Sequence, residues 1–296
     1  KNSWNSWIRC SGFDFFKDGE TAAVCSVTGD VWIVSGINES LKELKWRRFA
    51  TGLFQPLGLK IVDGQIYVLG RDQITRFHDL NKDGEADYYE NFNNDVSISN
   101  HYHEFCLNLS SDEAGNFYFI KGGNLGPATV PHHGCLIKVS KDGSQMEIIA
   151  TGHRAPNGMS VGPKGQITTA DNEGNWVPTS RLNLVKPGGF YGHVHTAHLT
   201  KVPTDYDKPL LWLPHQLDNS SGGQAWVTGN RWGPFEGDLL HLSYGKCSLF
   251  KIMKEEVNGG WQGAAVRFPL KFESGIMRGR FNPKDGQLYL AGLRVW

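Results

Sequence analysis

A dense run of oxygen-bearing side chains lies at residues 79–90, DLNKDGEADYYE. Its spacing fits the twelve-residue calcium loop, with oxygen ligands at alternating positions, glycine at position six and glutamate at position twelve. The alternative is a solvated acidic turn. The expected ligands are Asp79, Asn81, Asp83, the Glu85 carbonyl, Asp87 and Glu90. Because the flanking segments read as strands and not as helices, we predict that calcium stiffens this insert and switches nothing.

Histidines that could move a proton precede the expected strand at 105–109. His101 and His103 stand on either side of Tyr102, and an imidazole that titrates near neutrality suits proton abstraction from a hydroxyl group. The alternative is that these loop histidines only bind the backbone. Further histidines just outside strands could bind a transition metal, although they lack a short fixed spacing: His132, His133, His193, His195 and His215.

The stretch 152–193 gathers polar groups at the ends of short strands. MSVG and QITTAD read as two strands joined by PKG, a sequence that favours a tight turn. Within 171–176, the run Asp171 to Gly174 then places a carboxylate, an amide, a second carboxylate and a glycine where the second strand ends. Such loops commonly carry function because a rigid sheet positions them.

The same pattern of short strands and glycine-containing turns recurs six times, at 9–36, 56–79, 105–143, 152–193, 221–253 and 275–296. A unit of three or four short strands is typical of a propeller blade, since each small sheet buries its faces only against its neighbours. We therefore predict an all-β, six-bladed β-propeller that forms one domain over 1–296. The last copy stops after two strands. Either a strand at 4–9 completes that blade or the natural protein continues, and we favour a longer protein.

Composition supports an all-β chain and excludes some partners. The 36 glycines, 13 prolines and 35 aromatic residues suit many short strands and turns. Thirty basic and thirty acidic residues cancel, so we expect no nucleic-acid partner. No apolar run approaches the ~18 residues of a membrane span, and no leader-like segment is present. We therefore expect a soluble chain, with any targeting segment removed or outside it.

The five cysteines show no CxxC or zinc-finger spacing, which argues against structural zinc or attached haem. We expect mostly buried thiols. In an oxidising compartment one disulfide could form, Cys10 with Cys25 or Cys106 with Cys135.

Three ordered motifs in 152–193 resemble the soluble quinoprotein glucose/sorbosone dehydrogenase family. Arg154, Pro156 and Gly158 match its GHRNPQG motif, 171–174 lie at its metal-binding loop, and 182–192 match ELNLIRPGGNYGW. The resemblance extends to the propeller modules of large bacterial proteins that carry a haem domain. It implies a six-bladed propeller that oxidises a sugar or polyol hydroxyl with a histidine base and a calcium-bound pyrroloquinoline quinone.

The resemblance also implies roles for single residues, which we expect to converge on one face of the channel. His101 or His103 would be the base, and the 171–176 loop, with the side chain of Asp171 or Glu173, would place the quinone's calcium ion. Arg154 belongs to both the catalytic and the cofactor-binding set. The other expected cofactor-binding residues are Asn157, Asn172, Glu173, Lys246 and Arg278.

The family's paired arginines correspond without gaps to Gly275 and Met277 here, with Arg278 and Arg280 nearby. We therefore expect pyrroloquinoline quinone to bind weakly and any dehydrogenase activity to be modest. Two alternatives follow: a calcium-stiffened propeller that binds carbohydrate or a partner domain without a cofactor, and a propeller lyase or hydrolase for acidic sugars. The resemblance further implies a periplasmic or extracellular bacterial location and a c-type cytochrome domain as partner.

Overall fold

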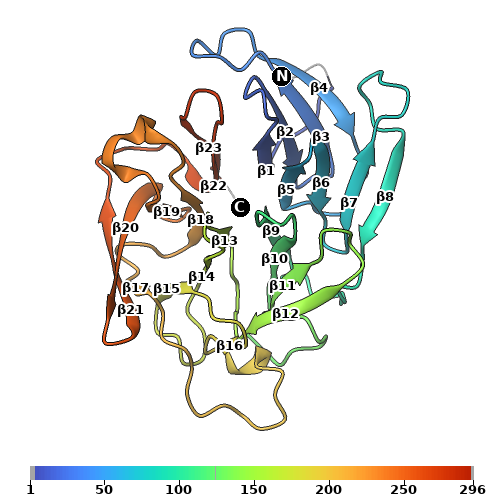
Figure 1. Cartoon of the computed structure of the whole chain (residues 1–296). Helices are drawn as coiled ribbons and strands as arrows, with labels where there is room; N and C mark the ends of the chain where they lie inside the picture. Colours follow the sequence, from blue (N-terminus) through green and yellow to red (C-terminus); the bar gives the residue numbers. More distant parts are fainter. Residues whose placement is uncertain (1–3, 124, 295–296) are drawn as a thin grey trace.

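In the described part of the chain, six sheets, antiparallel apart from one short parallel pair, surround a common axis (Figure 1). The computed structural model describes residues 4–123 and 125–294. The first strands of successive sheets contact one another, and β22 contacts β1, so the ring closes. The predicted six-bladed β-propeller is confirmed, and each predicted repeat falls on one sheet except 152–193, whose strand at 189–190 joins the sheet of the preceding repeat.

The strand bounds show the four-stranded plan of most blades. The first three blades contain β1 Cys10–Phe15, β2 Thr21–Ser26, β3 Val31–Ser35 and β4 Lys45–Ala50; β5 Gly58–Val62, β6 Gln65–Leu69, β7 Ile74–His78 and β8 Tyr88–Asn93; and β9 Cys106–Ser111, β10 Phe117–Lys121, β11 Leu136–Val139 and β12 Met146–Thr151. The short strand β16 Gly189–Phe190 pairs in parallel with β12.

The remaining blades contain β13 Gly158–Val161, β14 Ile167–Asp171, β15 Ser180–Leu184 and β17 Leu211–Leu213; β18 Ser221–Trp226, β19 Leu239–Ser243, β20 Ser248–Val257 and β21 Gly260–Arg267; and β22 Gly275–Phe281 with β23 Leu288–Leu293. Two 3-10 helices, η1 Val194–Thr196 and η2 Asn230–Phe235, lie between strands. Within the described residues the sixth sheet has two strands, and residues 4–9 add none to it. The end of the predicted last repeat, 295–296, lies outside the described residues.

Apolar side chains fill the space between blades, as their alternation along the strands predicts. Between the second and third blades, the Tyr67 ring packs on Phe117 with 4.6 Å between centroids and on Phe92 with 5.0 Å. Near the axis, backbones approach too closely for side chains. A Cβ atom at Gly58 would lie 2.6 Å from the Asn108 carbonyl oxygen, and one at Gly158 would lie 2.1 Å from that of Gly222. Glycine therefore permits the inner strands to pack around the axis.

The antiparallel order decides which loops share a face. The starts of first strands and the ends of second strands lie at one end of the propeller, which we call the entry end. The 79–87 loop joins β7 to β8, the third and fourth strands of its blade, so it lies at the opposite end. No helix in the described part of the chain is long and apolar enough to cross a membrane.

All five cysteines are free thiols, so neither of the two disulfides considered forms. In the strand registers, Cys10 stands opposite Ser26 and Cys106 opposite Lys121. Burial raises the pKa of Cys25 to about 11 and that of Cys106 to about 11, as expected for inert core thiols.

Candidate functional site

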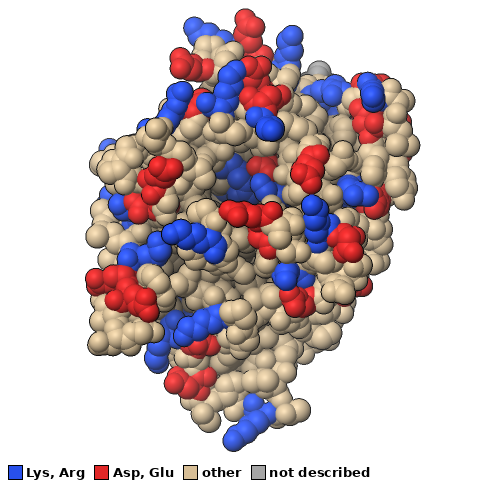
Figure 2. All heavy atoms as spheres, in the orientation of Figure 1, with Lys and Arg blue, Asp and Glu red and all other residues tan. Residues whose placement is uncertain are grey.

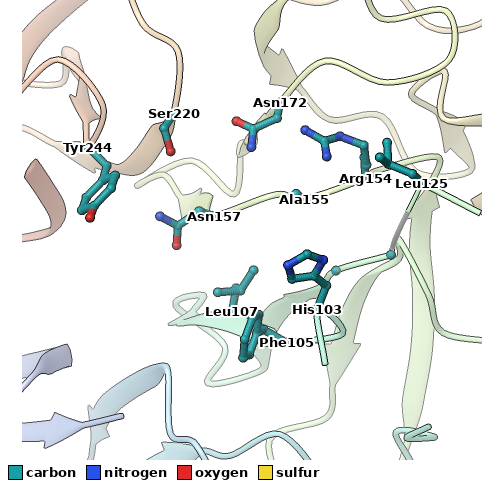
Figure 3. A pocket seen from close by; sticks show the side chains of 12 residues that line it. His103, Phe105, Leu107, Leu125, Arg154, Ala155, Asn157, Asn172, Ser220 and Tyr244 are labelled. Carbon is teal, nitrogen blue, oxygen red and sulfur yellow. The ribbon is translucent and has the colours of Figure 1, made fainter. Parts of the chain in front are cut away.

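A cavity of about 370 Å³ opens at the entry end and brings together four of the predicted site residues. They are His103, Arg154, Asn157 and Asn172, whose side chains surround a common space (Figure 3). Phe105 and Leu107 supply an apolar wall on one side. Two lining residues that the sequence did not single out are Ser220 and Tyr244.

Repeat position could have revealed both missed residues. Ser220 directly precedes β18, just as Asn157 directly precedes β13. Tyr244 directly follows β19, just as Asn172 directly follows β14. The equivalent strand ends of neighbouring blades therefore line the same cavity.

His103 stands on the cavity wall in the loop before β9. Its backbone N–H donates to Nδ1 of His101 at 3.3 Å, and its ring lies 3.8 Å from the Tyr102 ring between centroids. His101 does not line the cavity, and its Nδ1 is the acceptor of this bond within the loop. Partial desolvation, with His101 and Arg154 nearby, lowers the pKa of His103, which favours the neutral imidazole near pH 7. Of the two histidines, His103 lines the cavity and His101 does not.

Arg154 is held in place by the buried carboxylate of Asp171. The Asp171 oxygens accept hydrogen bonds from the backbone N–H groups of Arg154, at 2.7 Å, and Ala155, at 2.8 Å. Arg154 Nε donates to the Glu173 carbonyl oxygen, and its Nη2 lies 3.7 Å from the Glu173 carboxylate. His215 Nε2 approaches the other oxygen of that carboxylate at 3.4 Å. Asp171 thus fixes the backbone of the arginine and is already occupied as an acceptor.

Arg278 is buried next to a β-bulge in the last blade, outside the cavity lining. The register between β22 and β23 shifts between Ile276 and Arg278, which adds a residue to one strand and changes which face the following side chains occupy. Arg278 Nη1 and Nη2 donate to Asn157 Oδ1, each at 3.1 Å, and Nη2 also donates to the Leu57 carbonyl oxygen at 3.4 Å. Its guanidinium therefore lies beneath Asn157, between blades. The gap-free correspondence put Gly275 and Met277 at the family's arginine positions; Arg278, which was expected to bind the cofactor, directly follows Met277 and is buried.

The Arg280 side chain lies at the opposite end of the channel. Its Nη2 donates to the Leu109 carbonyl oxygen at 3.2 Å, and its Nε lies 3.9 Å from Asp14. Together with Lys60 it lines a second cavity, of about 350 Å³, where the first strands end. Figure 2 shows a hollow at the centre of the propeller with basic side chains inside it and acidic ones beside them.

Lys246 lies at the entry end but outside the cavity lining. It follows Tyr244 in the turn between β19 and β20, is exposed, and its backbone N–H donates to Ser243 Oγ at 3.0 Å. Glu173 is likewise outside the lining and reaches the site only through Arg154.

In the predicted calcium loop, acidic side chains accept hydrogen bonds from the loop's own backbone. Asp79 Oδ2 accepts from Gly84 N at 2.9 Å, Asp83 Oδ1 from Glu85 N at 2.9 Å, and Asp87 Oδ2 from Leu80 N at 2.6 Å. The Glu90 carboxylate is bound by Arg76 Nε and His78 Nε2, both at 2.6 Å. Among the described residues no group of three or more His, Cys, Asp or Glu side chains is gathered as a metal site.

Buried His153 supports the backbone next to Arg154. Its Nδ1 lies 3.2 Å from the Gly134 carbonyl oxygen, and its Nε2 lies 3.1 Å from Thr169 Oγ1. Burial lowers the pKa of His153 from 6.5 to about 4. The folded chain therefore keeps this ring neutral at pH values where the unfolded chain protonates it.

Acid is accordingly expected to destabilise the fold before the carboxylates titrate. Between pH 6.5 and about 4 the unfolded state binds one more proton than the folded state. This group therefore lowers the free energy of unfolding by up to ~3 kcal/mol as the pH decreases through that range. Urea unfolding at pH 7 and pH 4.5 measures the loss, and His153→Gln should shrink it. Exposed His215→Gln is the control. Equal losses in the native chain and both variants would contradict the assignment to His153.

The fold and the site together define a six-bladed propeller with a cavity at one end of its axis, lined by a histidine, an arginine and two amides beside apolar side chains. No protein-family model and no curated protein matches the sequence. Solved structures do match. A glucose dehydrogenase shares 18% identity over 97% of this chain and 94% of its own, with a TM-score of 0.74.

Two further structures carry the same fold. The soluble aldose sugar dehydrogenase of Escherichia coli, in its apo-form, shares 14% identity over 96% of this chain and 92% of its own, with a TM-score of 0.73. The PQQ-bound aldose sugar dehydrogenase of Streptomyces coelicolor shares 14% identity over 93% of this chain and 85% of its own, with a TM-score of 0.68. The chain thus has the glucose/sorbosone dehydrogenase-like propeller fold that its motifs predicted.

Proposed function

We propose that this propeller oxidises a hydroxyl group of a sugar or polyol, and that His103 accepts the hydroxyl proton. The observation that carries the proposal is the cavity at the entry end, where the imidazole of His103 stands among Arg154, Asn157 and Asn172 (Figure 3). A base with a pKa lowered from 6.5 is unprotonated at neutral pH and can take a proton at an imidazole nitrogen.

The cavity residues fit an anionic cofactor such as pyrroloquinoline quinone. Arg154 lines the cavity, and Arg278 lies beneath Asn157 with no carboxylate paired to it in the described part of the chain. The Arg278 Nε is buried without a hydrogen-bond partner, and a buried cation without a counter-charge is costly unless a ligand compensates it. Arg154, Asn157 and Asn172 would hold the group, which would supply the hydride acceptor when bound.

The chain's own residues prepare the substrate. Asp171 fixes the backbone at 154–155 and so sets the position of Arg154. Phe105 and Leu107 offer an apolar wall that excludes water and can contact the C–H face of a sugar ring. His103 then holds the substrate hydroxyl by a hydrogen bond before it accepts the proton.

Titration of the purified chain with pyrroloquinoline quinone and calcium, followed by dye-coupled assays on a panel of aldoses and polyols, tests this function. We expect dye reduction that depends on the quinone and on a sugar or polyol. Sugar binding without any dye reduction would instead support a carbohydrate-binding module. That second candidate is favoured by one observation: Glu173 already partly neutralises Arg154.

We also propose that the 79–90 loop binds calcium, at the end of the propeller away from the cavity. Asp79, in position one, has its Oδ1 buried without any hydrogen-bond donor, and Gly84, in position six, has φ +90°. An unsatisfied buried carboxylate oxygen is expected where a cation ligand belongs. Glu90 would have to release Arg76 or His78 to complete the set.

The double variant Asp79→Asn, Asp83→Ala is expected to lose calcium affinity and the thermal stabilisation that calcium gives. At a free calcium concentration of 100 Kd, binding stabilises the native chain by about 2.7 kcal/mol. Calorimetry and melting curves with calcium or with chelator measure both effects. Asp63→Asn, at an exposed turn of the same blade, is the control. If the double variant responds to calcium as the native chain does, the loop is only a solvated turn.

The setting in which such an activity would operate is part of the same proposal. A periplasmic or extracellular bacterial location and electron transfer to a c-type cytochrome domain follow from the motif resemblance. Reduction of a purified cytochrome c by the quinone-loaded chain and sugar, compared with the dye, would test the partner.

A further inference from the structure

Glu104 follows His103 in the chain and is completely buried. Its carboxylate accepts hydrogen bonds from Ser99 N, from Ser99 Oγ at 3.0 Å and from His133 Nε2 at 2.5 Å. Lys121 Nζ, also buried, lies 3.7 Å away. Burial acts to raise the pKa of Glu104, but the hydrogen bonds from His133 and Ser99 outweigh it and the pKa is lowered. Glu104 is therefore charged at neutral pH.

His133 is held as a neutral donor to this carboxylate. Its Nδ1 accepts a hydrogen bond from Thr129 N at 3.3 Å, so its ring proton is on Nε2, which faces Glu104. Burial, opposed by Glu104, lowers the pKa of His133. The negative charge of Glu104 is thus balanced by the buried cations Lys121 and Arg71, at 3.7 and 3.6 Å, and not by a histidinium.

Contacts run from Glu104 to the backbone of His103. Ser99 Oγ, which donates to Glu104, accepts from His101 N at 3.1 Å. Arg71 Nη2 donates to the His101 carbonyl oxygen. His101 Nδ1 in turn accepts from His103 N at 3.3 Å. The backbone N–H and carbonyl of His101 therefore both bond to residues that Glu104 contacts. His101 in turn accepts a hydrogen bond from the backbone of His103.

We infer that Glu104 is a positioning residue for His103: its buried carboxylate holds the 99–104 loop in the conformation that places the imidazole on the cavity wall. The inference rests on the proposed function for the role of His103 as a base. Proton transfer requires heavy atoms within hydrogen-bond reach, and a displacement of about 1 Å can lower a rate roughly 100-fold. A loop of exposed residues needs such an internal anchor, because Tyr102 and His103 themselves are exposed.

The test compares Glu104→Gln and Ser99→Ala with the control Glu113→Gln, an exposed glutamate beyond the other end of β9. In dye-coupled assays we expect Glu104→Gln to lower kcat about 10- to 100-fold and to change KM less than about twofold. In NMR titrations without cofactor, we expect the native chain to give a single His103 resonance. In Glu104→Gln this resonance should broaden or split. Glu113→Gln should match the native chain in both measurements.

Ser99→Ala covers the case in which Glu104→Gln fails to fold because Lys121 and Arg71 are left without their counter-charge. It removes only the hydroxyl that joins Glu104 to His101, and a smaller change in the same direction supports the inference. Native kcat and a native His103 resonance in a folded Ser99→Ala or Glu104→Gln chain would overturn it. A native chain that oxidises no sugar, but whose His103 resonance still depends on Glu104, would overturn the proposed function and uphold the positioning.

Discussion

Replacing His103 with glutamine is expected to lower kcat for sugar oxidation by about 10²- to 10⁴-fold, the usual contribution of a general base. Glutamine has a similar reach and keeps a hydrogen-bonding group on the cavity wall, but it cannot accept a proton at neutral pH. Because the substrate hydroxyl can still be bound, KM should change by less than the rate does. Initial rates over a range of sugar concentrations, with quinone and calcium saturating, measure both constants.

The pH profile gives a second readout for the same variant. A base must be unprotonated, so the native rate should fall as pH drops through the pKa of His103, which lies below its usual value of 6.5. The variant should lack this acidic limb. His195→Gln, which alters a histidine outside the cavity lining, is the control and should keep it. A His103→Gln chain with the native rate and profile would show that another group takes the proton.

The fold could be predicted from the sequence because every blade of a propeller repeats the same sequence pattern. Each repeat alternates short apolar strands with glycine turns, and a blade can bury its faces only against another blade. The number of blades follows from counting repeats. The weakest repeat, 275–296, is also the one in which register, and not pattern, decides which side chains reach the channel.

A β-bulge next to Arg278 decides which face of β22 this expected cofactor-binding residue occupies. Side chains alternate along a strand, so one inserted residue exchanges the two faces from that point onward. The bulge between Ile276 and Arg278 depends on the pairing with β23, which a comparison of motif spacing along one chain does not contain. Spacing also could not decide which residue of the turn after β19 faces the cavity: Tyr244 lines it, and Lys246 lies outside the lining.

The choice between His101 and His103 also lay beyond the sequence. Both are separated from β9 by only a few residues, and spacing predicted that they flank the site. Hydrogen bonds within the loop settle their orientation: His101 Nδ1 is used by the His103 backbone, and the His101 carbonyl is used by Arg71. The groups that set these bonds, Glu104 and Arg71, come from two blades and meet only in the folded chain.

Replacing Arg278 with glutamine is expected to weaken binding of pyrroloquinoline quinone by about two to three powers of ten. The guanidinium is buried next to Asn157 and lacks a carboxylate partner in the described residues, so an anionic ligand is the group that would compensate its charge. Removing one member of a buried, hydrogen-bonded charge pair costs about 2 to 5 kcal/mol, and each 1.4 kcal/mol is about tenfold in affinity. The sequence predicted weak binding because the family's arginine pair is missing, unless Arg278 and Arg280 replace it.

Burial, with Arg280 adding to it, lowers the pKa of Arg278 to about 10, the direction expected for a buried cation without a counter-charge. Glutamine at this position should therefore lower the affinity for the ligand far more than it lowers the stability of the fold. Fluorescence titration gives the affinity, and melting curves without ligand give the stability. Arg280→Gln is the matched control, since that side chain serves the opposite cavity near Asp14 and should change quinone affinity by less than about threefold. Equal losses of affinity in both variants would mean that the quinone is attracted by the channel's general charge and not by the arginine that the bulge turns toward Asn157.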